Sequence, residues 1–160
     1  MVDQHIALRV KLSDIVEGLE FQADERFSYL NTAMGEVVSV TTEELRAAEE
    51  DTPLEDFPDW QHEAIHMAKD IVETDHYLPL PDRFEIHEYS IMERFCLSVD
   101  DDDLRDDLCD AIRGRGAFRR FKDRMQLYGM AEEWYRYRDA ALREIAIAWC
   151  EEHGIPYTET

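Results

Sequence analysis

A segment rich in arginine, residues 113–124, holds six of the 17 Lys and Arg residues of a chain whose formal net charge is -21. Residues 111–128 alone sum to +5, whereas residues 1–60 and 61–110 each sum to -11. Cations that gather in an otherwise acidic chain either pair with neighbouring carboxylates or hold an anion. This basic segment is therefore the first place at which to expect chemistry.

The types and spacing of its residues suit an anion. Gly114 and Gly116 let a ligand approach the backbone closely, and a helix that begins near Gly116 directs free N–H groups and the positive end of its dipole at the same region. Arg120 and Arg124 are four residues apart, so they share a helix face and can hold phosphate or carboxylate oxygens in two-point contacts. The predicted ligand-binding residues are Arg113, Gly114, Arg115, Gly116, Arg119, Arg120 and Arg124, extended by Arg136 and Arg138.

The same segment also fits a structural role. Aspartates at positions 100–103, 106, 107 and 110 come just before it, and a short turn would fold them against the arginines. Such a protein would be a structural or interaction protein whose basic segment is an internal ion-pair clamp, since ion pairs between surface side chains are common. Both interpretations stay open on the sequence alone.

A second motif, His62-Glu-Ala-Ile-His66, matches the H-E-x-x-H pattern of zinc hydrolases. Two histidines four residues apart on a helix can chelate zinc, with Glu63 as the general base toward a metal-bound water. Val72 occupies the position at which one class of these enzymes has its third histidine. A metal-dependent hydrolase that uses His62, Glu63 and His66 is the alternative from another functional class; no P-loop, dinucleotide fingerprint or serine nucleophile elbow is present, and no cofactor is expected.

Composition narrows the compartment and the partners. With 160 residues, 44% of them hydrophobic, the chain can bury one core, and a single domain over residues 1–160 is expected. The first residues lack a basic leader with an apolar run, and no segment approaches the ~18 apolar residues of a membrane span. Cys96, Cys109 and Cys150 indicate reduced thiols, so a cytoplasmic location is expected. A pI near 4.5 argues against general nucleic-acid binding.

The elements that must position these residues are mostly helical. Residues 26–30 and 36–40 have the pattern of a β-hairpin around Gly35, with residues 6–10 as a possible third strand. Residues 47–59 are acidic and interrupted by proline, which indicates a mobile loop. Helical patterns occupy 14–21 (capped by Ser13), the stretch after 41, 60–72, 86–99, 104–112, 118–128 and 134–153.

These patterns predict an α+β fold, mainly helical, with a small antiparallel hairpin sheet near the N-terminus packed on a layer of four or five helices. The apolar stripes of the last two helices predict one seam, in which Trp134, Ile145 and Trp149 pack against Phe118 and Phe121.

Several stretches resemble the bacterial uncharacterised protein family 0158. They are Tyr29-Leu-Asn-Thr-Ala-Met-Gly-Glu36, Tyr77-Leu-Pro-Leu-Pro81, Glu88-Tyr-Ser-Ile-Met-Glu-Arg-Phe95, residues 113–123 and Glu133-Trp-Tyr-Arg-Tyr-Arg-Asp139. The resemblance covers roughly residues 8–155 and implies a cytosolic bacterial α+β protein, without an activity or catalytic residues. The leading functional expectation is thus a non-enzymatic binding protein, whose basic segment holds a phosphate-bearing small molecule or the acidic surface of a partner protein.

Overall fold

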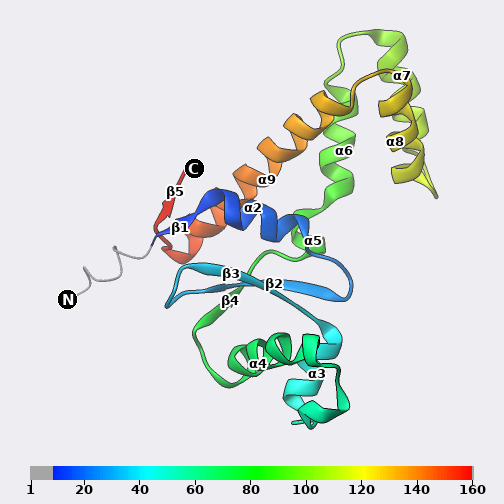
Figure 1. Ribbon diagram of the computed structural model, residues 1–160. Helices are drawn as coiled ribbons and strands as arrows, with labels where there is room; N and C mark the ends of the chain where they lie inside the picture. Colours follow the sequence, from blue (N-terminus) through cyan, green and yellow to red (C-terminus); the bar gives the residue numbers. More distant parts are fainter. Residues whose placement is uncertain (1–8, 160) are drawn as a thin grey trace. The chain divides into compact units, whose positions relative to one another are not determined.

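The computed structural model describes residues 9–159, which form two compact units (Figure 1). Unit 1 takes the chain as far as Ile86 and again from Ile145 onward, and unit 2 is the continuous stretch from His87 to Glu144. The fold is α+β and mainly helical, as the sequence predicted. The expectation of a single domain over residues 1–160 stays a prediction. None of the described helices combines the length and the apolar character needed to cross a membrane.

Unit 1 is built around a three-stranded antiparallel sheet. The predicted hairpin is confirmed as β2 (Arg26–Asn31) and β3 (Glu36–Thr41), and Gly35 takes the positive φ of its turn at 74°. The third strand is β4 (Tyr77–Pro79), which pairs with β2 and gives the order β3-β2-β4. Pro79 fits there because an edge strand can spare an N–H.

The expectation that residues 6–10 join this sheet is wrong for the part that the structure describes. β1 (Val10–Lys11) pairs in parallel with β5 (Tyr157–Thr158) in a separate two-stranded sheet, and residues 6–8 lie outside the described residues. Two-residue strands carry too little pattern for the sequence to reveal their partner.

Helices cover both faces of the three-stranded sheet (Figure 1). On one face, α2 (Leu12–Glu20) brings Gly18 so close that a Cβ atom there would lie 2.8 Å from side-chain atoms of Val37 and Leu80. Ser28 donates from its hydroxyl to the Gly18 carbonyl over 2.8 Å, which fixes α2 to β2. The helix begins at Leu12 without a side-chain cap, so the predicted cap at Ser13 is wrong.

The other face carries α3 (Thr42–Glu49) and α4 (Asp59–Glu73), whose apolar side chains pack with Tyr29 and Val40. Thr41 and Glu44 form a reciprocal capping box at the start of α3. The segment between the two helices contains the short 3₁₀ helix η1 (Leu54–Asp56). The mobility expected for residues 47–59 stays a prediction.

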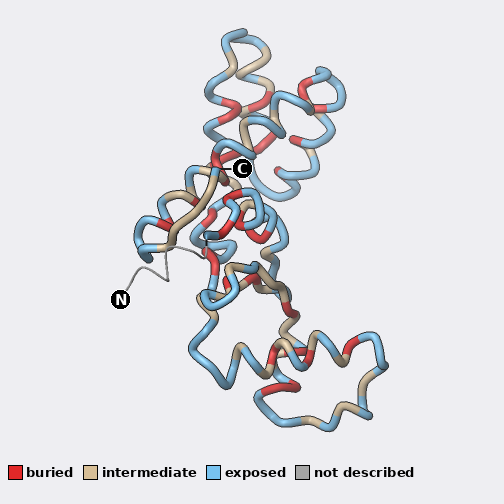
Figure 2. Tube along the Cα trace, turned by 60° about the vertical axis from the view of Figure 1, so that its left-hand side comes forward, coloured by how far each residue is buried: buried red, intermediate tan, exposed pale blue. Residues whose placement is uncertain are grey.

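Unit 2 consists of helices around an apolar cluster. Buried residues alternate with exposed ones along each helix, as Figure 2 shows. The rings of Phe95 and Phe121 lie 6.1 Å apart, edge to face, and Phe121 lies 4.8 Å from Trp134. The helices of this unit are α6 (Glu88–Leu97), α7 (Asp102–Ala111), α8 (Ala117–Leu127) and the first part of α9 (Ala131–His153).

The remaining helices contribute to unit 1. They are α5 (Arg83–Ile86) and the C-terminal part of α9, which ends as predicted before Gly154, a glycine with a φ of 65°. The predicted seam between the last two helices is confirmed for Trp134, whose ring lies 4.8 Å from that of Phe121, and wrong for Phe118, which is 51% exposed. Trp149 is buried as predicted, and it belongs to the part of the 23-residue helix α9 that lies in unit 1.

Candidate binding sites

Arg120 closes the turn between α7 and α8. Its guanidinium donates from Nε to the Ala111 carbonyl over 2.7 Å, from Nη1 to the Arg115 carbonyl over 2.6 Å, and from Nη2 to the Arg113 carbonyl. One of these acceptors lies in the last turn of α7, where helical carbonyls lack partners within the helix. The planar guanidinium of an arginine can donate to three acceptors at once, so Arg120 stabilises the turn by hydrogen bonds to its backbone carbonyls.

Both glycines of this turn have positive φ values, and Gly116 also lies in close contact with Arg120. Gly114 and Gly116 have φ values of 72° and 75°, in the left-handed region that favours glycine. A Cβ at Gly116 would lie 3.1 Å from Nη1 of Arg120. Gly116 is the N-cap of α8, and the helix begins without a side-chain cap and without an acidic residue in its first turn.

Arg124, one turn further along α8, pairs with α7. Its Nε donates to Oδ2 of Asp107 over 2.9 Å, and the Tyr128 hydroxyl donates to the same carboxylate oxygen. The hydrogen bond from Tyr128 is the largest cause that holds the pKa of Asp107 below its ordinary value. The hydrogen bond from Arg124 and the positive charge of Arg124 act in the same direction. The same hydrogen bond raises the pKa of Tyr128, because it favours the protonated phenol.

Two further arginines of the predicted site have acidic partners. Arg113 lies 3.7 Å from a carboxylate oxygen of Asp110, between two exposed side chains. Arg138 donates from Nε to Glu88 over 2.7 Å, which joins α9 to the start of α6 within unit 2. The structure thus directs Arg113, Arg120, Arg124 and Arg138 toward groups of the protein itself.

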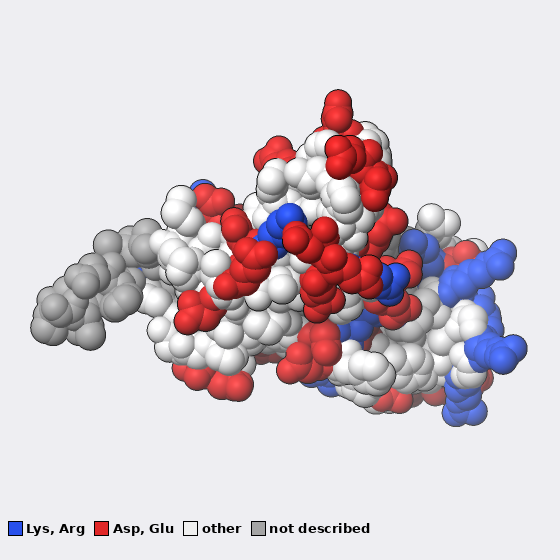
Figure 3. Space-filling view, turned by 90° about the horizontal axis from the view of Figure 1, so that it is seen from below, with Lys and Arg blue, Asp and Glu red and all other residues white. Residues whose placement is uncertain are grey.

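The other cations remain exposed to solvent. Within residues 9–159, the side chains of Arg115, Arg119, Lys122 and Arg136 make no ion pair. On the face drawn in Figure 3, Lys and Arg side chains gather at the right edge, over α8, whereas Asp and Glu prevail elsewhere. Arg119 and Lys122 lie three residues apart on α8 and are therefore neighbours on its surface.

A groove of about 480 Å³ lies between α8 and α9. Its walls include Phe118 and Lys122 from α8 and Trp134 and Tyr135 from α9. Phe118 is 51% and Tyr135 57% exposed, so the groove offers aromatic surface next to a free ammonium group. Arg136 does not line it, because helical spacing turns this residue away from Tyr135 and Arg138. The sequence analysis did not predict this groove. It placed Phe118 in the core and did not include Lys122 among the ligand-binding residues.

The histidine pair lies on α4 in unit 1. His62 uses its Nε2 in a 2.9 Å hydrogen bond with the Phe57 carbonyl, while His66 is exposed. Among residues 9–159, no group of three or more His, Cys, Asp or Glu side chains is placed to hold a metal ion. Within this part of the chain, His62 and His66 therefore have no third protein ligand placed to complete a zinc site.

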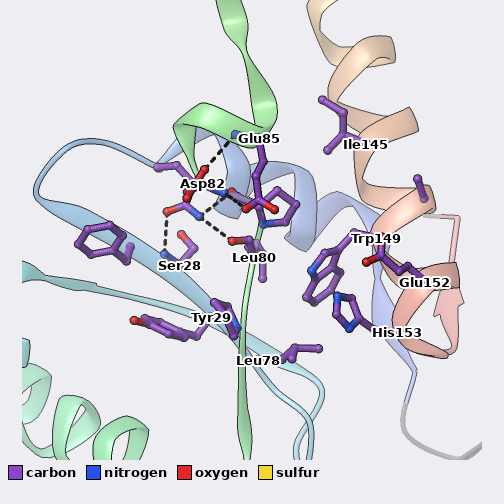
Figure 4. A pocket seen from close by; sticks show the side chains of 15 residues that line it. Ser28, Tyr29, Leu78, Leu80, Asp82, Glu85, Ile145, Trp149, Glu152 and His153 are labelled. Atoms are coloured by element: carbon purple, nitrogen blue, oxygen red, sulfur yellow. Dashed lines mark hydrogen bonds between the residues drawn. The ribbon is translucent and has the colours of Figure 1, made fainter.

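A pocket that the sequence did not predict lies in unit 1, with a volume of about 600 Å³ (Figure 4). Its lining comes from three distant parts of the chain: the sheet, the turn that leads into α5, and the end of α9. In Figure 4 the indole of Trp149 and the imidazole of His153 extend from α9 toward the strands. Burial, with the Glu49 carboxylate as a second cause, raises the pKa of Tyr29, another lining residue.

Comparisons with known proteins place the chain in a family. The profile of an uncharacterised protein family, UPF0158, matches residues 5–159. A protein of Pseudomonas aeruginosa (strain PAO1) described as "UPF0158 protein PA5073" is 32% identical over 66 residues, which are 41% of this chain and 43% of that protein. The match thus spans less than half of the relative's length, and no solved structure matches the chain. Because the family profile covers nearly all of the sequence, the chain belongs to the uncharacterised family UPF0158.

Proposed function

We propose that this chain is a non-enzymatic cytosolic binding protein, which holds an acidic segment of a partner protein along α8 in unit 2. The observation that carries the proposal is the groove between α8 and α9, where the exposed rings of Phe118 and Tyr135 lie beside Lys122. Free thiols at Cys96, Cys109 and Cys150 agree with a reducing compartment.

The distribution of the arginines favours an extended partner over a small phosphate-bearing molecule. A two-point grip on phosphate needs guanidinium groups that converge, yet Arg120 donates to three carbonyls and Arg124 to Asp107. Arg115, Arg119 and Lys122, which make no ion pair with any described residue, are spread over the turn and α8. A row of separate cations suits a row of carboxylates.

The aromatic lining adds an apolar requirement to the charge. Contiguous apolar patches that stay exposed are typical of interaction surfaces, and aromatic side chains are enriched where partners bind. The expected ligand is therefore an acidic segment that inserts one apolar side chain between Phe118 and Tyr135, while its carboxylates lie near Arg119 and Lys122.

A fluorescently labelled peptide of alternating Glu and Asp residues with one central Phe is the direct probe, measured by anisotropy against the full chain. The double variant Arg119→Glu with Lys122→Glu should weaken binding about tenfold, because each reversal replaces an attraction with a repulsion. Arg136→Glu is the control for a single reversal, since it makes the same change of charge as Lys122→Glu on an exposed residue that does not line the groove. Its affinity should stay within about twofold of the unmodified protein.

Two further ligands separate this proposal from its competitors. A peptide in which Gln and Asn replace the acidic residues should bind weakly, and pyrophosphate should give no heat in calorimetry at concentrations that saturate the peptide. Tight pyrophosphate binding that is lost in Arg115→Ala would instead favour the small-anion site. Equal affinity of the double variant and Arg136→Glu for the acidic peptide would refute the proposed surface.

A further inference from the structure

The indole N–H of Trp149 has no hydrogen-bond partner among the described residues. The residue is only 7% exposed, and its one described interaction is the contact with the ring of His153, at 5.2 Å. Within residues 9–159, no side-chain nitrogen or oxygen is both sealed from solvent and unpartnered. The indole N–H of Trp149 therefore keeps access to solvent, and the residue lines the pocket. A donor in such a place favours a ligand that presents an acceptor.

Carboxylates surround the same pocket. Asp82 and Glu85 cap each other: the Glu85 amide donates to Oδ1 of Asp82 over 2.9 Å, and the Asp82 amide donates to Oε1 of Glu85 over 3.0 Å. Each carboxylate keeps its second oxygen for another partner. Glu152, on α9, contributes a third carboxylate that makes no ion pair within the described residues.

No lysine or arginine offsets this charge at the pocket lining. The nearest base along the chain, Arg83, is paired with Asp24 over 2.8 Å. His153 is the one basic side chain among the lining residues, and its ring lies tilted by 55° against Trp149. Asp82, Glu85 and Glu152 are themselves exposed, so an entering cation would meet carboxylates without a lysine or arginine in the lining and feel the modest attraction of surface charges.

Much of the remaining lining is apolar or aromatic and includes Leu78, Leu80 and Ile145 (Figure 4), although Gln22 and Ser28 also contribute to it. Such walls favour a flat hydrophobic body, and aromatic rings also attract cations. The pocket thus combines three requirements: a positive charge for the carboxylates, a ring for the walls and an oxygen acceptor for the indole N–H.

We propose that this pocket binds a small aromatic amine, with its ammonium group attracted by the lining carboxylates of Asp82, Glu85 and Glu152 and an oxygen acceptor directed at the indole N–H of Trp149. This ligand site lies within unit 1 and is independent of the α8 surface in unit 2.

Tyramine is a suitable probe, because it carries an ammonium group, a ring and a phenolic oxygen. Titration of the ¹⁵N-labelled full chain should shift the indole cross-peak of Trp149, assigned by its loss in Trp149→Phe. The cross-peak of Trp60, a residue that is 79% exposed and outside the lining, should stay in place. Two analogues test the separate requirements: 4-hydroxyphenylacetate replaces the amine with a carboxylate, and 2-phenylethylamine lacks the phenolic oxygen. The first should cause no shift, and the second should bind more weakly than tyramine.

Neighbouring glutamates on α9 provide matched variants. Glu152→Gln removes a lining carboxylate and should raise the dissociation constant for tyramine about threefold, the size expected for a partly exposed ion pair. Glu151→Gln makes the same change on the adjacent exposed residue, which does not line the pocket, and should leave the constant unchanged. Glu85→Gln is a second test variant, since its amide oxygen can still accept from Asp82.

The proposal fails if the Trp149 cross-peak does not move at millimolar tyramine. It also fails if 4-hydroxyphenylacetate shifts that cross-peak as strongly, or if Glu151→Gln and Glu152→Gln weaken binding equally. Retention of the dispersed spectrum in each variant shows that a lost shift reflects the ligand rather than unfolding.

Discussion

Nε of Arg124 lies 2.9 Å from Oδ2 of Asp107, and this ion pair joins α8 to α7. The Tyr128 hydroxyl donates to the same oxygen. The carboxylate therefore receives one donor from α8 and one from Tyr128, the residue that follows this helix, and its negative charge is favoured in the folded protein. Its pKa accordingly lies below the ordinary value of 3.8.

This pair predicts a pH-dependent cost for Asp107→Asn. A carboxyl group whose folded pKa is lowered contributes stability above its unfolded pKa, and the contribution disappears as the pH falls through the folded pKa. The variant should thus unfold at a lower urea concentration near pH 7, and the difference from the unmodified protein should shrink as the pH falls below 3.8. Asp123→Asn, an exposed residue of α8, should show no such pattern. A constant difference at every pH would contradict the ion pair.

The three thiols should differ in reactivity. Burial is the largest cause that raises the pKa of Cys96 to about 12 and that of Cys150 to about 11. Because the thiolate is the nucleophile, both should react with iodoacetamide at about pH 8 more than ~100-fold slower in the folded protein than in urea. Cys109 is only partly buried and should be alkylated first. Peptide mass spectrometry over a time course gives the order, and equal rates for all three thiols in the folded protein would be the contrary result.

Gly18 in α2 should not tolerate alanine, although alanine is the better helix former by ~1 kcal/mol. A Cβ there would lie 2.8 Å from side-chain atoms of Leu80 and Val37, inside the contact between α2 and the sheet. Overpacking of this kind costs roughly 1–3 kcal/mol, so Gly18→Ala should lower the free energy of unfolding on balance. Glu17→Ala, at an exposed position of the same helix, serves as the control in urea denaturation. A gain in stability for Gly18→Ala would contradict this prediction and would show that the side chains of Leu80 and Val37 can move aside at little cost.

Arg120 should be needed for the turn, and lysine should not replace it. The guanidinium serves three carbonyls that belong to Ala111, Arg113 and Arg115, and a single ammonium group cannot span them. Arg120→Lys should cost about 1–2 kcal/mol of unfolding free energy, because part of this hydrogen bonding is lost in a partly buried place. Arg119→Lys, at an exposed position, should cost nothing measurable. Thermal unfolding of the two variants side by side measures the contrast.

Sequence reasoning succeeded where the signals are local. The hairpin of β2 and β3 follows from alternating residues around Gly35, and α3 follows from the capping residues Thr41 and Glu44. It failed for short strands whose partners lie far away in the sequence. β4 has three residues, and Tyr77 pairs with Asn31 far back in the chain, so no local pattern identifies its partner.

The candidate sites show the same division. Helical spacing correctly predicts that Arg120 and Arg124 share a face of α8, but it does not tell which face meets α7, because the turn decides this. Arg119 and Arg120 are neighbours in sequence, yet one is exposed and the other closes the turn. The pocket at Trp149 left no sequence signal except Trp149 and His153 four residues apart, since its carboxylates come from separate segments.

Unit 1 includes residues from both sides of unit 2, and its β1 pairs with β5 near the end of the chain. This arrangement sets an order for folding during synthesis. The ribosome completes residues 87–144 before it makes the part of α9 that carries Trp149. All residues of unit 2, with its apolar cluster around Phe95 and Phe121, are therefore synthesised before those of unit 1 are complete. Unit 1 must wait with Val10 unpaired until Tyr157 has left the exit tunnel, and during that interval its nascent chain is the part that needs protection from aggregation.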